Sequence, residues 1–113
     1  MSLPVERALF FTADFERQFA WYVQKAGEEV AWRFHRALDE SIRKISNQPD
    51  LGRQRHFRHP RLQHLRSFQV ERPFNKLLIF YPVDGNILQA LRLMHGARDL
   101  PRRLSQPPGL EDD

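Results

Sequence analysis

The sequence contains no cysteine. The chain therefore has no disulfide framework, no thiolate for a metal and no cysteine nucleophile, and its folding does not require an oxidising compartment. It also lacks a long apolar segment, because the longest uncharged apolar run, LLIFYPV, is far too short to span a bilayer. The N-terminus lacks the basic, apolar and small-residue order of a signal peptide. These absences lead us to expect a cytoplasmic protein without a membrane partner.

Acidic residues and lysine are scarce in the second half of the chain. Residues 1–52 carry seven Lys or Arg against eight Asp or Glu, whereas residues 53–113 carry eleven against six, and ten of those eleven are arginine. Arginine presents a planar set of donors that suits phosphate and carboxylate groups. The distribution predicts an acidic partner, which is a nucleic acid, an acidic protein segment or both. A solvated basic surface without a specific partner is the simpler alternative.

The first half of the chain predicts one strand and two helices. The run ALFFT, residues 8–12, favours a short strand because aromatic and β-branched residues suit a buried pleated surface. Thr12 is a suitable N-cap for a helix over residues 14–26, with acidic residues in its first turn, and Gly27 ends that helix. Apolar residues at helical spacing predict a second helix from residue 28 or 29 to about residue 46. The two helices are expected to form an antiparallel hairpin.

The second half predicts a basic loop and three strands. Residues 53–66, RQRHFRHPRLQHLR, have neither helical nor strand periodicity, and we interpret them as a loop. The segments LRSFQVE, KLLIFYPV and ILQALRLMH then alternate as three successive antiparallel strands, with Asp84-Gly85 as a strong hairpin signal between the last two. The tail SQPPGLEDD, residues 105–113, is Pro-rich and acidic and is expected to be disordered. Residues 1–104 are expected to form a single domain.

Together these elements predict an α+β fold with the order β-α-α-β-β-β, in which the helical hairpin packs on one face of a small, mostly antiparallel sheet. The first strand must pair within the sheet, because its backbone groups otherwise lack partners. Arginines and histidines are expected to gather on the opposite face or its rim, as a groove. In the last strand, Leu91 and Leu93 are expected in the core, on the opposite pleat from Arg92, and Gly96 is expected to turn the chain out of the sheet.

The histidines allow two kinds of chemistry to be considered. His56, His59 and His64 lie close together, but no cysteine or acidic residue lies among them and five arginines repel a cation, so we expect no metal. No P-loop or dinucleotide fingerprint is present, so we expect no cofactor. His95, at the end of the last strand, could exchange protons during RNA cleavage while nearby arginines stabilise the phosphate. The structural alternative is that His95 only hydrogen-bonds at its strand end and that Asp99 neutralises Arg98.

A surface for a partner protein is the third possibility, since a small sheet exposes an edge that a strand or an amphipathic helix can cover. The fold order, the segment NQPDLGRQR, the strand pair LRSFQVERPFNKLLIFYPV and the segment LRLMHGARDLPRRL together resemble the RelE/ParE superfamily of toxins from bacterial type II toxin-antitoxin modules, and most closely its ParE-like branch. The resemblance covers about residues 5–104, and HGARD is its most specific part. It implies a growth-inhibiting toxin that a cognate antitoxin neutralises with an acidic or amphipathic C-terminal segment.

The resemblance implies one of two targets. ParE-like members bind DNA gyrase and stabilise its cleaved-DNA complex, which blocks replication, whereas RelE-like members cut messenger RNA on the ribosome with basic residues and an acid/base residue on the concave face of the sheet. The only lysine after residue 52 is Lys76, and neither tyrosine lies near the end of the last strand. These departures from the nuclease pattern favour gyrase. A metal-independent mRNA endonuclease and a degenerate toxin that only binds antitoxin stay open as alternatives.

Eight arginines are predicted to bind the antitoxin or the target. They lie in the basic loop, in the last strand and in the segment that follows it. They are Arg55, Arg58, Arg61, Arg66, Arg92, Arg98, Arg102 and Arg103. The nuclease alternative takes Arg66 and Arg98 from this set and adds His95 as the acid/base residue.

Overall fold

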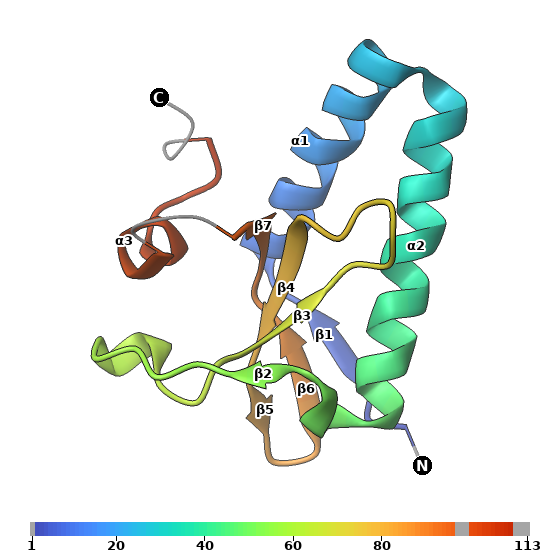
Figure 1. The fold of residues 1–113 in the computed structure, drawn as a ribbon. Coiled ribbons are helices and arrows are strands. Elements are labelled where there is room, and N and C mark those ends of the chain that lie inside the picture. The colour runs from blue at the N-terminus through green and yellow to red at the C-terminus, as the bar shows by residue number, and fades with distance from the viewer. Residues whose placement is uncertain (1, 97–99, 110–113) are drawn as a thin grey trace.

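The computed structural model describes residues 2–96 and 100–109. It contains a long helical hairpin, two small sheets and a short C-terminal helix (Figure 1). In chain order the elements are β1 (Val5–Arg7), α1 (Leu9–Ala26), α2 (Glu28–Asn47), the 3-10 helix η1 (Pro49–Leu51), β2 (Arg53–Gln54), the 3-10 helix η2 (Pro60–Leu62), β3 (Arg66–Gln69), β4 (Leu77–Tyr81), β5 (Val83–Asp84), β6 (Ile87–Ala90), β7 (Arg92–His95) and α3 (Leu100–Ser105).

The strands form two sheets. One is antiparallel with the order β2-β3-β4-β7, and the other has the order β1-β6-β5, in which β1 lies parallel to β6. The last two predicted strands each pass from one sheet to the other, with breaks at Pro82 and Leu91. The Asp84-Gly85 hairpin is confirmed, and Gly85 has a φ of 62°, which glycine adopts readily. The predicted α+β fold, a helical hairpin packed on a mostly antiparallel sheet, is likewise confirmed.

The prediction of a strand over residues 8–12 is wrong. The first strand is β1, three residues earlier, and α1 already begins at Leu9. Thr12 does not cap a helix, because it lies inside α1 and its backbone N donates to the carbonyl of Ala8 (3.0 Å). Phe11 is fully buried from within the helix, so the aromatic run supplies a helical core residue. A short apolar run cannot by its periodicity distinguish a buried strand from a helix turn.

The helical hairpin covers one face of the antiparallel sheet. The α2 prediction is confirmed, and the helix buries Phe34, Leu38, Ile42 and Ile45 at helical spacing. These side chains form the main core together with residues of both sheets, among them Leu77, Ile79, Tyr81, Leu88 and Leu93. Each large apolar side chain buried there contributes about 1.5–3 kcal/mol. The hairpin is therefore held chiefly by this apolar contact.

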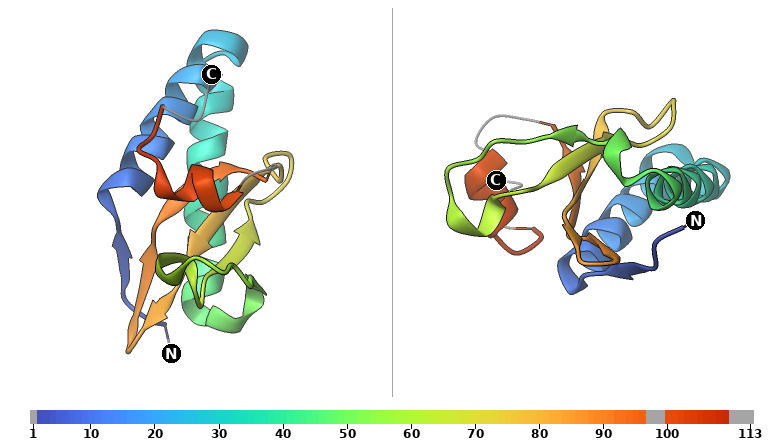
Figure 2. Two further views of the ribbon diagram at one scale, coloured as in Figure 1. Left: turned by 90° about the vertical axis from the view of Figure 1, so that its left-hand side faces the viewer. Right: turned by 90° about the horizontal axis from the view of Figure 1, so that it is seen from below.

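The other face of the same sheet is also apolar and covered. Leu78 and Phe80 alternate with the main-core residues of β4 and form a second cluster with Leu62, Leu65, Met94, Leu100 and Leu104. The basic loop and α3 lie over this face, on the side opposite α2 (Figure 2). Arginines and histidines therefore do not spread across it, contrary to part of the prediction. The break at Leu91 also places Leu91 against this second cluster and Leu93 in the main core.

The short helix α3 was not predicted, and it packs on the second cluster through Leu100 and Leu104. The predicted domain limit at residue 104 and the disorder of residues 105–113 stay predictions, since residues 110–113 lie outside the described part of the chain. Gly96 follows β7 directly, and residues 97–99, where the chain was expected to turn away, also lie outside it. No helix within the described residues is long and apolar enough to cross a membrane.

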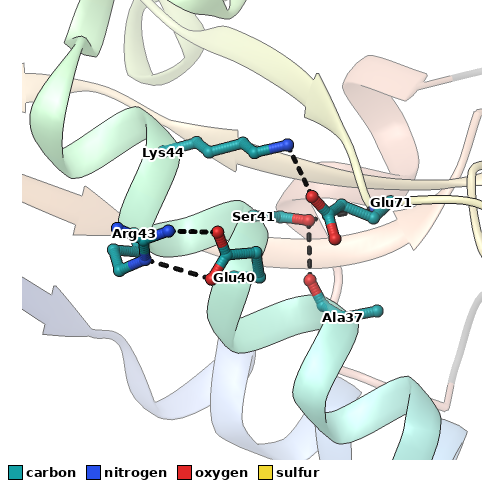
Figure 3. A network of polar contacts seen from close by, with 6 residues as sticks. All are labelled: Ala37, Glu40, Ser41, Arg43, Lys44 and Glu71. Carbon is teal, nitrogen blue, oxygen red and sulfur yellow. Dashed lines mark hydrogen bonds and ion pairs between the residues drawn. The ribbon is translucent and has the colours of Figure 1, made fainter.

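A polar network fastens α2 to the connection between β3 and β4 (Figure 3). The buried Ser41 hydroxyl donates to the carbonyl of Ala37 (2.8 Å) and accepts from the backbone N of Glu71 (3.0 Å). Lys44 forms an ion pair with the Glu71 carboxylate, and Arg43 pairs with Glu40 on the same helix. The network holds the connection beside the helix.

Aromatic rings fill the space between the two helices and this connection. The ring of Phe74, from the connection, lies 5.3 Å from that of Tyr22 and 5.5 Å from that of Phe34. Both tryptophans lie on the hairpin and are about half exposed, Trp21 on α1 and Trp32 on α2. The core thus continues along the hairpin, while its outer surface carries aromatic side chains in water.

The segment PDLG packs against the end of β4. The Tyr81 hydroxyl donates to the carbonyl of Pro49 (2.7 Å) and accepts from the backbone N of Gly52 (2.9 Å). Arg66 donates to the carbonyl of Gly52 (2.8 Å). A Cβ atom at Gly52 would lie 2.3 Å from the Tyr81 hydroxyl oxygen. Only glycine leaves room for this contact.

Gly52→Ala should lower the free energy of unfolding by about 1–3 kcal/mol, because the added methyl group displaces a buried tyrosine. Denaturant titration would measure the change. Gln54→Ala, at an exposed position two residues away, is the matched control and should change stability by less than about 0.5 kcal/mol. Unchanged stability in Gly52→Ala would contradict the close packing described above.

Candidate functional site

A groove of about 610 Å³ lies where the start of α1, the η2 segment and α3 meet. Its walls are mainly apolar and include Leu9, Phe10, Leu62, Leu65, Phe80, Leu91 and Leu104. Leu9 is 82% exposed, which leaves a large apolar side chain in water beside the groove. His59 and Arg61 also line it and add polar groups to its wall. Apolar walls with neighbouring cations suit an amphipathic segment that carries acidic residues.

Arg92 lies in the interior, with only 3% of its surface exposed. Its Nε and Nη2 atoms contact the two carboxylate oxygens of Asp14 at 2.8 and 3.0 Å. Its Nη1 atom donates to the carbonyls of Arg103 and Leu104 (3.1 Å each) and of Gln106. A buried charge is tolerated only when it is paired and hydrogen-bonded, and Arg92 is both. We therefore leave Arg92 out of the proposed contact residues.

Asp14 completes this junction from α1. It was predicted to lie in the first turn of its helix, but α1 begins at Leu9, so Asp14 lies further along the helix and no acidic residue lies in the first turn. Its side chain is buried, with only 6% of the residue exposed. Besides Arg92, its Oδ2 atom accepts a hydrogen bond from the backbone N of Leu93 (2.9 Å). Asp14 thereby satisfies an outward-facing donor of β7. The pair joins α1, β7 and the end of α3.

The basic loop, residues 53–66, is not the plain loop that was predicted, because it contains β2 and η2 and ends on the first residue of β3. Two of its arginines also have structural contacts. Besides the carbonyl of Gly52, Arg66 reaches that of Asp50 (3.4 Å). Arg55 donates through Nε to the Ser67 hydroxyl (2.8 Å), and its guanidinium carbon lies 5.9 Å from the centre of the Phe80 ring. Burial, followed by the charge of Arg53, lowers the pKa of Arg55. These contacts fix both side chains against the sheet.

The other predicted arginines are placed differently. Arg58, Arg61 and Arg102 are exposed, and their side chains form no hydrogen bond or ion pair with any other residue that the structure describes. Arg103 donates to the carbonyl of His95 (3.2 Å). Arg98 lies outside the described residues. Exposed arginines without a protein partner are the ones available to an external anion.

His95 ends β7 opposite Leu77 of β4. The residue is exposed overall, but its side chain is partly buried. This burial, and after it the charges of Arg103 and Lys76, lower the pKa of His95. The imidazole is therefore neutral at pH 7 and able to accept a proton. In the described part of the chain no three His, Cys, Asp or Glu side chains are grouped so that they could hold a metal ion.

Arg66 and His95, combined in the nuclease alternative, do not come together. Arg66 pairs with Tyr81 of β4, whereas His95 pairs with Leu77 of the same strand. At about 3.3 Å per residue, these positions are roughly 13 Å apart along the strand. The Arg66 guanidinium also points to the carbonyls of the PDLG segment. The two side chains are therefore not placed to contact the same phosphate, as the nuclease alternative requires.

The groove was missed in the sequence because Leu9 and Phe10 were assigned to a strand. Phe11, Phe15 and Tyr22 have the spacing of a helix face, and Leu9 lies off that face. Extending the helical pattern back to Phe11 would have shown Leu9 as an apolar residue on the outside of a helix. That pattern, together with the nearby arginines, is the signal that could have indicated a docking surface.

Comparison with known proteins identifies the family. The sequence pattern of the family described as "ParE toxin of type II toxin-antitoxin system, parDE" matches residues 8–100. The chain belongs to the ParE toxin family. The predicted superfamily and its ParE-like branch are thereby confirmed. No curated protein matches the chain significantly.

A solved structure shares the ParE fold. It is described as "Chromosomal ParDE TA system from P. aeruginosa", and it is 20% identical in sequence with a TM-score of 0.69. The match covers 85% of this chain and 98% of that chain. At this identity the likeness concerns the fold, and it agrees with the arrangement of the helical hairpin and sheets described above.

The Arg92 contacts predict that replacing Asp14 destabilises the protein much more than replacing Asp39 does. Asp14→Ala leaves Arg92 buried without its counter-charge and should lower the free energy of unfolding by about 3–5 kcal/mol. Asp39→Ala removes a carboxylate from an exposed pair with Arg7 (3.1 Å) and should cost at most about 1 kcal/mol. Denaturant titration of both variants gives the comparison. Equal losses would mean that the buried pair does not fix the fold.

Proposed function

We propose that this ParE-family toxin inhibits DNA gyrase by binding it and stabilising its cleaved-DNA complex, without catalysis of its own. The observation that carries this proposal is the covered second face of the antiparallel sheet. Leu78, Phe80 and Met94 lie on that face beneath the basic loop and α3. A metal-independent nuclease needs an acid, a base and a cation open on one surface. An apolar, covered face supports a binding role instead.

The mRNA endonuclease remains the alternative because His95 is exposed and can accept a proton. Its predicted partner Arg66 lies near the other end of β4 and is engaged with the main chain. A degenerate toxin, which binds antitoxin but has no target, is the second alternative. The proposed target and partner are both cytoplasmic, so the proposal includes a cytoplasmic location.

Expression without an antitoxin should cause filamentation and a DNA-damage response. Purified toxin should inhibit gyrase supercoiling and should leave messenger RNA intact in a translation-dependent cleavage assay. His95→Ala should keep full toxicity, because no proton transfer is needed. Cleaved mRNA together with loss of toxicity in His95→Ala would establish the nuclease, and absence of growth arrest would establish the degenerate toxin.

We further propose that the cognate antitoxin is held at the groove. An amphipathic segment of the antitoxin would bury its apolar side chains against Leu9, Phe10 and Leu62. Its acidic residues would lie near the exposed Arg102 of α3. Leu9 supports this assignment, because a side chain of that size gains free energy only when a partner removes it from water.

Leu9→Glu should weaken antitoxin binding at least about tenfold, because it places a carboxylate in the apolar contact and repels an acidic partner. Val83→Glu is the control, since Val83 is an exposed apolar residue (40%) of β5 outside the groove and receives the same charge. Calorimetric titration with the antitoxin encoded beside the toxin measures both dissociation constants. Equal affinities for the two variants would remove the groove from the interface.

A further inference from the structure

We propose that the basic loop, residues 53–66, binds the phosphodiester backbone of a nucleic acid. This function goes beyond the proposed contacts with gyrase and antitoxin, because the loop would touch nucleic acid directly. The segment contains five arginines, three histidines and no acidic residue in fourteen positions. Arginines clustered within one short segment are the electrostatic pattern of a backbone-binding surface.

The loop is held in place on the sheet. The side chains of Leu62 and Leu65 are buried in the second cluster. The backbone N of Arg55 donates to the carbonyl of Leu65 (2.8 Å), and Arg53 pairs with Ser67 of β3. The loop projects from the sheet on the side away from α2 (Figures 1 and 2). Its outward side chains therefore start from fixed positions, which reduces the entropy lost on binding.

The charges of the loop are not neutralised within the protein. Arg53, Arg58 and Arg61 are exposed, and in the part of the chain that the structure describes no carboxylate forms an ion pair with them. The next acidic residue along the chain, Glu71, is paired with Lys44. The positive charge of Arg53 also contributes to lowering the pKa of Arg55. An external polyanion would relieve this repulsion and release counterions.

The histidines add directed donors to the same surface. His56, His59 and His64 are exposed. The Nδ1 atom of His59 accepts from the backbone N of Arg61 (3.1 Å), so the ring proton lies on Nε2. That atom can donate to a phosphate oxygen. Arginine and histidine donors interleaved over a few residues match the oxygen-rich backbone of a nucleic acid.

A phosphodiester fits the loop better than an acidic protein segment does. Protein interfaces rest on an apolar centre, and the groove already offers one. Among the described residues, no large apolar side chain between 53 and 66 is exposed. The outward surface of the loop therefore provides charge and hydrogen-bond donors without apolar area. Nucleic-acid contacts of the backbone type require only those.

Fluorescence anisotropy with a labelled 20-base-pair duplex and the purified full chain tests the proposal. If three phosphates are neutralised, affinity should fall roughly 40-fold between 50 and 200 mM salt. Arg58→Ala combined with Arg61→Ala should weaken binding and reduce the slope of log affinity against log salt by about two. Arg33→Ala with Arg36→Ala removes the same charge from exposed positions of α2 and should leave the slope unchanged.

Further arms identify the ligand. A single-stranded RNA of equal length replaces the duplex, and binding of either nucleic acid that depends on Arg58 and Arg61 supports the proposal, the tighter one being the natural source. Absence of binding at 50 mM salt, or equal losses in the loop and α2 variants, overturns it. Tighter binding of a 20-residue poly-glutamate peptide than of both nucleic acids also overturns it.

Circular dichroism establishes that each variant is folded. No gyrase or antitoxin is present, so failure of gyrase inhibition leaves this result unaffected.

Discussion

The buried contact between Arg92 and Asp14 is the constraint on which the rest of the structure depends. It joins residues 78 positions apart and brings α1, β7 and the end of α3 to one point. Two charges inside a protein are stable only when every donor and acceptor finds a partner. Here the carboxylate also receives the backbone N of Leu93. Because α1 and α3 both line the groove, its shape follows from this contact.

Successive side chains of β4 point to opposite faces of the sheet, and each face is covered by a different layer of the protein. Leu77, Ile79 and Tyr81 face the helical hairpin, whereas Leu78 and Phe80 face the basic loop and α3. The second layer is small, so it covers the sheet but leaves a groove at its border. Cations are carried on the outside of that layer. The same strand therefore supports the main core and the surface on which we place the partners.

Sequence patterns predicted those features that depend on neighbours along the chain. The repeat of Phe34, Leu38 and Ile42 indicated α2, and Asp84-Gly85 indicated the hairpin. The family resemblance rested on local segments such as HGARD. The match of the ParE family pattern to residues 8–100 confirms it. The role of Arg92 could not be predicted, because its partner is distant in the sequence and an arginine has the same pattern whether buried or exposed. The groove was missed for a different reason, because Leu9 and Phe10 were assigned to a strand although they begin α1.

The placement of both tryptophans has a spectroscopic consequence. Trp21 and Trp32 lie half exposed on the helical hairpin, and Trp21 is twelve residues, or about 18 Å of helix, from Leu9 at the groove. The tryptophan emission of the protein thus comes entirely from the hairpin. A ligand that quenches or shifts this emission contacts that helical surface. A ligand that occupies the groove or the basic loop leaves the emission unchanged.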